Sequence, residues 1–268
     1  MPAGRGAGAG GVMIERLDRL WRTSATGVCF ALFGLGGLGL RFLVFPTLNL
    51  STREPARRSE LARRWIRGSF RLFVGLMSAL GVLSYELHGF ERLRRRGLLV
   101  LANHPSLIDV VFLMAFIDHA DCVVKAALLE NPFTRGPVRA TGYICNDSGP
   151  QLVDQCIASL RAGNNLILFP EGTRTAVAGS HPLRRGAANV AVRGECDITP
   201  VLIRCEPPTL GKGGKWYRVP PRRVHYRLEV CDDIRIDDFL APGSPAIAAR
   251  RLTRHLQEFF ARETTPYA

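Results

Sequence analysis

Apolar residues follow one pattern in the first third of this chain and a different pattern after about residue 97. The N-terminal part holds two long apolar stretches, from Ala25 to Leu50 and from Ser69 to Leu87, and both are interrupted by glycines and arginines. Stretches of this length approach the thickness of a bilayer. We therefore expect a pair of membrane-associated helices. A single true span and two helices that merely cover a soluble core are the open alternatives.

From residue 97 onward, short apolar runs alternate with longer amphipathic ones. The runs that predict strands lie within 97–103, 122–128, 141–145, 166–170, 198–203 and 224–231, and those that predict helices lie within 107–117, 150–162, 184–192 and 244–262. Such alternation is typical of α/β folds whose sheet is covered on both faces. We expect a mixed, largely parallel sheet flanked by helices, with the proline- and glycine-rich residues 206–222 as a loop.

These patterns divide the chain into three parts. Residues 1–11 are rich in glycine and alanine and are predicted to be a disordered tail. Residues 12–90 are predicted to form the membrane-associated helical hairpin, and residues 91–268 the α/β domain.

The net charge of the chain indicates what kind of partner it binds. The 36 basic residues exceed the 23 acidic ones, which gives a net charge of +13, and lysine occurs only at positions 125, 212 and 215. Such an excess predicts an anionic partner: nucleic acid, a membrane surface or a phosphorylated substrate. Arginines precede, separate and follow the two apolar stretches, and a hairpin that lies in the membrane interface keeps all three groups beside anionic headgroups. We therefore favour the cytoplasmic face of the cell membrane.

A basic nucleic-acid-binding protein is the alternative of a different class. It predicts aromatic side chains among the basic ones or a helix-turn-helix, whereas aromatics make up only 8% of this chain and the arginines gather around apolar helices. The seven cysteines contain no C-x-x-C pair, which favours a reduced, cytosol-facing protein without a zinc site.

A first candidate motif, Asn103-His104-Pro105-Ser106-Leu107-Ile108-Asp109, follows a predicted strand and opens a predicted helix. Proline keeps His104 outside the helix, so a carboxylate in the first turn can reach back to the imidazole. Asp109 would then orient the ring and leave its other nitrogen free to take a proton from a hydroxyl. A histidine that only caps the helix is the simpler alternative.

A second candidate motif, Phe169-Pro170-Glu171-Gly172-Thr173-Arg174, follows the predicted strand LILFP. Gly172 lets backbone amides approach an oxyanion, Arg174 can bind phosphate with its planar fork, and Glu171 can accept hydrogen bonds from hydroxyls. Open α/β sheets bind ligands at such strand ends. Taken alone, the motif also fits an ordinary turn with a surface ion pair.

Together and in this order, the two motifs resemble those of the lysophospholipid acyltransferases, the glycerolipid acyltransferase family typified by 1-acylglycerol-3-phosphate acyltransferase. The resemblance covers about residues 60–230. It includes N-H-x-x-x-x-D, F-P-E-G-T-R without a substitution, the segment Thr199–Ile203 and the step Arg185-Gly186-Ala187.

The resemblance implies direct transfer of a fatty acyl group from acyl-CoA or acyl-carrier protein to a lysophospholipid hydroxyl, with no metal and no further cofactor. It implies that His104 is the general base and Asp109 its orienting partner. The residues it assigns to substrate binding are Asn103, Glu171, Gly172, Thr173, Arg174 and Arg185. A non-catalytic scaffold of the same fold would require a broken motif, and both are intact.

One position departs from the family. Ser148 stands where the family usually has an arginine that contacts the acceptor's phosphate. Arg139, Arg184 or Arg185 would have to compensate. Otherwise the acceptor carries no phosphate monoester, as in a glycolipid, an aminolipid or an aryl-polyene lipid.

Overall fold

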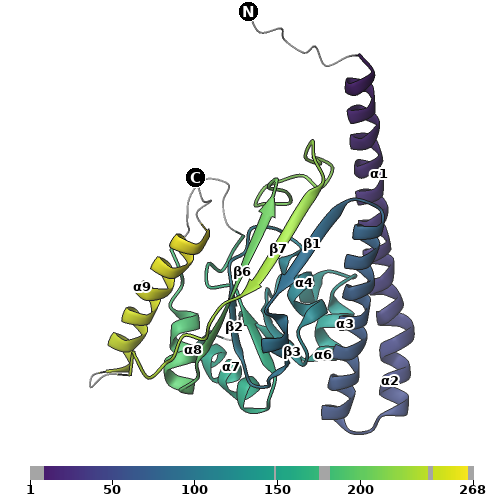
Figure 1. The fold of residues 1–268 in the computed structure, drawn as a ribbon. Coiled ribbons are helices and arrows are strands. Elements are labelled where there is room, and N and C mark those ends of the chain that lie inside the picture. Colours follow the sequence, from purple (N-terminus) through teal and green to yellow (C-terminus); the bar gives the residue numbers. More distant parts are fainter. Residues whose placement is uncertain (1–8, 148, 175–181, 241–243, 265–268) are drawn as a thin grey trace, which may run out of the picture.

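The computed structural model describes residues 9–147, 149–174, 182–240 and 244–264, and these residues form a seven-stranded sheet in the order β1-β7-β6-β2-β5-β3-β4 (Figure 1). The strands are β1 Leu83–His88, β2 Leu99–Ala102, β3 Ala120–Val124, β4 Ile144–Cys145, β5 Asn165–Leu168, β6 Ile198–Glu206 and β7 Val224–Val230. Neighbouring strands are parallel except β6 and β7, which are antiparallel. The predicted mixed, largely parallel sheet is thus confirmed.

Helices cover both faces of this sheet (Figure 1). They are α1 Ala9–Gly39, α2 Phe45–Ser51, α3 Pro55–Ala79, α4 Asp109–Phe116, α5 Ala127–Glu130, α6 Arg135–Thr141, α7 Leu152–Arg161, α8 Gly186–Gly194 and α9 Pro245–Thr264, with a π-helical turn at Leu40–Val44 and 3₁₀ turns at Phe90–Arg94 and Gly149–Gln151. Side chains of α1, α3 and α4 share one core with the sheet. Those of α7, α8 and α9 form a second core on the opposite face.

The helices α1 and α2 form a long apolar rod along one side of the molecule (Figure 1). Within the described residues, Met13–Ser51 is the one helical stretch long and apolar enough to cross a membrane, and only 17% of its most apolar window is buried. Large apolar side chains on its outer surface are exposed, among them Leu17, Leu20, Leu35, Phe42, Leu43 and Leu50. Its inner surface packs on α3, where Phe33 and Phe73 have ring centroids 4.9 Å apart.

Two boundaries differ from those expected. The hairpin was predicted to extend to residue 90, but α3 ends at Ala79, and β1 already belongs to the sheet, parallel to β7. Gly81 has a positive φ of 73°, which ends the helix, and the alternating LSYELH that follows has the period of a strand. At the other end, α1 begins at Ala9, within the predicted tail, while residues 1–8 lie outside the described residues.

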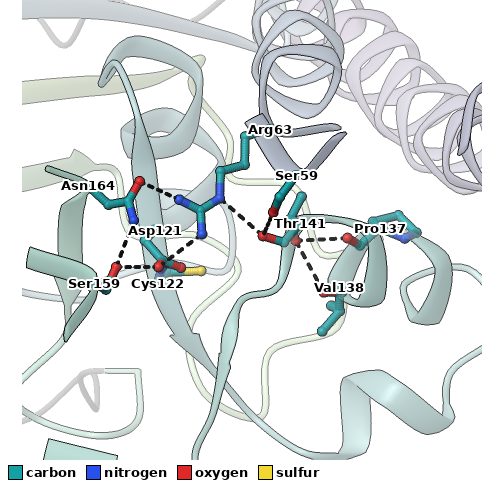
Figure 2. Close-up of polar contacts among 9 residues, drawn as sticks. All are labelled: Ser59, Arg63, Asp121, Cys122, Pro137, Val138, Thr141, Ser159 and Asn164. Carbon is teal, nitrogen blue, oxygen red and sulfur yellow. Dashed lines mark hydrogen bonds and ion pairs between the residues drawn. The ribbon is translucent and has the colours of Figure 1, made fainter. Parts of the chain in front are cut away.

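A buried ion pair fixes α3 to the sheet. Figure 2 shows the Arg63 guanidinium among three hydrogen-bond partners. Its Nη2 lies 3.1 Å from Asp121 Oδ2 on β3, and its Nε donates to the Thr141 carbonyl of α6 at 3.1 Å. Nη1 donates to Asn164 Oδ1 at 2.6 Å, and Ser159 Oγ donates to the same Asp121 oxygen at 2.5 Å. The N-terminal helices are therefore attached to the α/β unit by a satisfied polar network.

Candidate active site

The two sequence motifs meet at one edge of the sheet. His104 comes two residues after β2, and the Phe169–Arg174 segment follows β5 directly. Because β2 and β5 are parallel neighbours, with Leu101 opposite Leu168, their carboxyl ends bring both segments to the same place. This is the position at which open α/β sheets present their ligand-binding loops.

His104 and Asp109 are in direct contact, as their spacing predicts. The imidazole Nδ1 lies 2.8 Å from Asp109 Oδ2, the histidine side chain is 16% exposed, and that of Asp109 is completely buried. An ionised carboxylate can only accept, so Nδ1 carries the proton and Nε2 is the basic nitrogen. Across the part of the chain that the structure describes, Nε2 has no hydrogen-bond partner, and it is therefore available to accept a proton.

Ser106 completes the surroundings of Asp109. Its backbone N–H donates to Oδ2 at 2.6 Å, and its hydroxyl donates a short hydrogen bond to Oδ1. Burial raises the pKa of Asp109 above its ordinary value, while the hydrogen bonds from His104 and Ser106 act in the opposite direction. Three donors thus converge on one carboxylate, which they hold in a single orientation.

The second motif supports the histidine directly. Glu171 Oε1 accepts a hydrogen bond from the backbone N–H of His104 at 3.2 Å, although the two residues are 67 positions apart. The Phe169 ring stacks on the imidazole, with centroids 4.2 Å apart and planes 23° from parallel. The histidine and the glutamate-containing loop therefore face one common site.

Gly172 and Arg174 shape the loop around that site. Gly172 has a φ of 67°, a backbone conformation that favours glycine, and the flexible Arg184 side chain lies where a Cβ would stand. Arg174 Nη1 donates to the carbonyls of Leu210 and Gly211 at 2.8 and 3.0 Å. Leu107 N–H donates to the same Leu210 carbonyl at 3.1 Å. The 206–222 loop after β6 is thereby tied to both motifs.

The remaining residues that the resemblance assigns to substrate binding are placed as follows. Asn103 is buried, and its amide exchanges two hydrogen bonds, of 2.7 and 2.8 Å, with the backbone of Ile203 on β6. This pairing locks the end of β2 to β6 and fixes where His104 emerges. Thr173 is half-buried beside Gly172, and Arg185 is exposed just before α8. Ser148, where the family's arginine is expected, lies outside the described residues.

Some contributors to this site carry no role in the sequence analysis. Ser106 was detectable, because Ser106-x-x-Asp109 has the spacing of a helix capping box. Arg184 was named only as a substitute for the missing arginine, and the structure places its side chain over Gly172.

Cys122 and Cys145 lie in β3 and β4, as expected, and burial raises the pKa of both thiols, which disfavours a thiolate nucleophile.

The comparison with known families agrees with this geometry. The family model described as Acyltransferase matches residues 84–204, a range that contains both motifs. Over residues 84–204 the chain therefore matches an acyltransferase domain. The resemblance found from the two motifs is thus confirmed.

Curated acyltransferases of glycerolipid type are similar to part of this chain. The 1-acyl-sn-glycerol-3-phosphate acyltransferase of Pseudomonas aeruginosa is 27% identical over 60% of this chain and 62% of its own length. The Saccharomyces cerevisiae protein of the same name is 29% identical over 66% of this chain and 58% of its own length. The chain spans 47% to 63% of the lengths of the curated relatives it matches.

The fold has a solved counterpart. The crystal structure of the 1-acyl-sn-glycerophosphate acyltransferase from Thermotoga maritima aligns with a TM-score of 0.66, at 17% identity, over 95% of this chain and 99% of that one. At this identity the likeness concerns the fold alone.

Proposed function

We propose that this protein is an O-acyltransferase that moves a fatty acyl group from a thioester, acyl-CoA or acyl-carrier protein, to a hydroxyl of a lysophosphatidic acid-like lysophospholipid. The observation that carries the proposal is the contact between His104 Nδ1 and the buried Asp109, at a strand edge shared with Glu171. The names of the relatives, which are 1-acyl-sn-glycerol-3-phosphate acyltransferases, support the substrate class.

The proposed reaction uses His104 twice. Nε2 takes the proton of the acceptor hydroxyl while its oxygen attacks the thioester carbonyl, and Asp109 stabilises the resulting imidazolium. When the tetrahedral intermediate collapses, the carbon–sulfur bond breaks, and the thiolate receives the proton from His104. The products are an ester and a free thiol, and the histidine returns to its starting state.

The loop between β5 and α8 supplies the proposed acceptor contacts. Arg174 uses Nη1 for protein carbonyls, and its other three N–H donors lie on Nε and Nη2, where they are suited to phosphate. Arg184 crosses Gly172 in the same loop and adds a second guanidinium. Both cations therefore belong to the same loop as Glu171, and Glu171 accepts the hydrogen bond from His104 N–H.

His104→Asn tests the base. Asparagine Nδ2 can occupy the position of Nδ1 and keep the bond to Asp109, but nothing replaces Nε2. Thiol release from an acyl thioester should fall by about 10²–10⁴-fold, with an unchanged melting temperature. His88→Asn, at an exposed position on β1, is the matched control. If His104→Asn kept most of the wild-type activity, His104 would be rejected as the base.

Mass spectrometry of the products tests the acceptor. Wild-type protein is given mixed acyl thioesters and a panel of lysolipids, with His104→Asn as the blank. Acylated lysophosphatidate is the expected product. Acylation confined to glycolipid, aminolipid or aryl-polyene acceptors would reject the lysophospholipid assignment while leaving the chemistry intact, and it would fit Ser148 in place of arginine.

We also propose that α1 and α2 attach the protein to the cytoplasmic face of the cell membrane through their exposed apolar surface. Replacing Leu35, Phe42 and Leu43 with serine should move the protein from membranes to the soluble fraction or weaken its recovery with vesicles. Leu240 and Ile247, also exposed but in the α/β part, serve as control positions. Undiminished membrane recovery of the triple variant would count against this surface.

A further inference from the structure

A cavity lies at the opposite edge of the sheet from His104. It has a volume of about 610 Å³ and is bounded by α3, by Arg96 just before β2, and by the starts of β3 and β5 at Ala120 and Asn164. Since β2, β3 and β5 are parallel, these amino ends face away from the His104 edge. The four residues of β2 alone separate the two edges by about 13 Å.

Four arginines line this cavity, and three of them already have a carboxylate partner. Arg63 pairs with Asp121 in the network of Figure 2, and Arg64 pairs with Glu60 at 2.8 Å on the same helix. Arg67 forms a close ion pair with Asp118. The charges of these three side chains are therefore largely balanced by the protein itself.

Arg96 differs from the other three. Its Nη2 lies 2.8 Å from Nε2 of His119, and since arginine only donates, the imidazole accepts. Burial and the nearby Arg96 lower the pKa of His119, which keeps the ring neutral. Among the described residues, no carboxylate pairs with Arg96, and its side chain is exposed. The cavity thus holds one guanidinium whose charge is unbalanced and whose orientation is fixed by a neutral partner.

The walls of the cavity suit an organic group attached to an anion. Met114, Ile117 and Ala120 provide apolar surface, and the Tyr143 ring lies beside the Arg63 guanidinium. A volume of this size falls within the usual range for small-molecule sites. The exposed Arg64–Glu60 pair adjoins this surface and can rearrange, because such surface pairs are weak.

We propose that this cavity binds the phosphate group of a small phosphoester or of a phospholipid headgroup, with Arg96 as the principal contact and Arg64 as a second one. Phosphate presents several oxygens in the geometry of the guanidinium fork, and its charge matches the unbalanced cation. The site is distinct from the proposed acceptor site, which lies at the other edge of the sheet.

Two binding measurements on the full-length protein separate the two sources. Isothermal titration calorimetry with glycerol 3-phosphate, in detergent micelles, probes a soluble ligand. Native mass spectrometry of protein from phosphatidylcholine nanodiscs containing phosphatidic acid counts retained anionic lipid. Both are run on wild type, on Arg96→Gln and on Arg250→Gln, which removes the same charge from an exposed position on α9. All three proteins can also hold ligand at the His104 edge. The binding that counts is therefore the difference between wild type and Arg96→Gln.

Arg96→Gln should weaken the scored binding by at least about tenfold, while Arg250→Gln leaves it unchanged, and both keep the wild-type rate of acyl transfer and melting temperature. Arg96-dependent binding of glycerol 3-phosphate assigns the site to a soluble phosphoester, and dependence seen only with phosphatidic acid assigns it to a headgroup. No binding of either probe, or equal binding by Arg96→Gln and Arg250→Gln, would overturn the proposal. Its failure would leave the acyltransferase proposal untouched, because that rests on His104→Asn.

Discussion

Replacing Asp109 with asparagine removes the negative charge beside His104 while keeping the size of the side chain. Oδ2 accepts from His104 Nδ1 at 2.8 Å and from Ser106 N at 2.6 Å, and Oδ1 accepts from the Ser106 hydroxyl. The hydroxyl can rotate and accept instead, whereas the backbone N–H can only donate, so the amide oxygen takes the Oδ2 position. The imidazole then keeps its orientation, and the variant isolates the contribution of the charge.

The expected loss follows from that contact. A hydrogen bond to a charged group contributes about 1.5–3 kcal/mol and one to a neutral group about 0.5–1.5 kcal/mol. The variant keeps the bond and loses the difference, about 1–1.5 kcal/mol, and each 1.36 kcal/mol is tenfold in rate. We therefore expect kcat/KM for acyl transfer to fall between about 5-fold and about 13-fold. The loss should be smaller than in His104→Asn, which removes the base itself. Initial rates of thiol release over a range of acceptor concentrations provide the measurement.

Asp109→Asn should not lower the stability of the folded protein, although it lowers the rate of acyl transfer. Burial raises the pKa of Asp109 in the folded state above its value in the unfolded chain, so the folded state holds the proton more tightly. Stability from this group is therefore present at low pH and is lost as pH rises through the interval between the two values. Asp109→Asn has no such titration, and its melting temperature at neutral pH should equal or exceed that of wild type.

Asp154→Asn, 62% exposed on α7, is the matched control for both measurements. If Asp109→Asn were as active as Asp154→Asn, the carboxylate would have no part in the reaction. A lower melting temperature with full activity would instead make Asp109 a structural residue.

Three further substitutions test how the site is held. Arg63→Gln leaves Asp121 buried without its cation and should lower stability in thermal unfolding by about 3–5 kcal/mol. Arg64→Gln breaks a surface ion pair and should cost at most about 0.5 kcal/mol. Similar losses of stability in the two variants would contradict the assignment of a buried pair. Gly172→Ala places a Cβ at a residue with a φ of 67°, so it should lower stability by about 1–2 kcal/mol and reduce kcat/KM. Wild-type kinetics in this variant would refute the expectation. Arg22→Gln removes donors to two carbonyls of the 206–222 loop, at 2.7 and 2.9 Å, and should speed proteolysis there; an unchanged cleavage rate would show that the loop is held by other contacts.

Local patterns in the sequence were sufficient for most of the element order. The runs predicted as strands contain β2, β4 and β7 and overlap β3, β5 and β6, and the runs predicted as helices contain all or most of α4, α7, α8 and α9. Apolar periodicity reports which face of a segment is buried, and that information is local. The strand β1 was missed although LSYELH alternates, because it directly continues a long apolar stretch that was read as helix.

The contact between His104 and Asp109 was predictable for a similar reason. His104 and Asp109 are five positions apart, so the proline and the start of the helix decide their contact. Their meeting with the second motif was expected only in general terms, from the rule that parallel strands share a carboxyl edge. The specific bond from His104 N–H to Glu171 depends on the register of β2 against β5.

The sequence by itself thus determined the resemblance to the acyltransferases, most of the order of strands and helices, and the contact within the first motif, because residue type and short-range spacing encode them. Only the tertiary structure decided that Arg174 holds the loop after β6 and that Arg63 binds Asp121 across 58 positions. It also placed Arg96 beside His119 in the cavity at the amino ends of the strands, where no carboxylate among the described residues pairs with it. Each of these depends on segments distant in the chain, whose pairing is set by the packing of the whole sheet rather than by any local pattern.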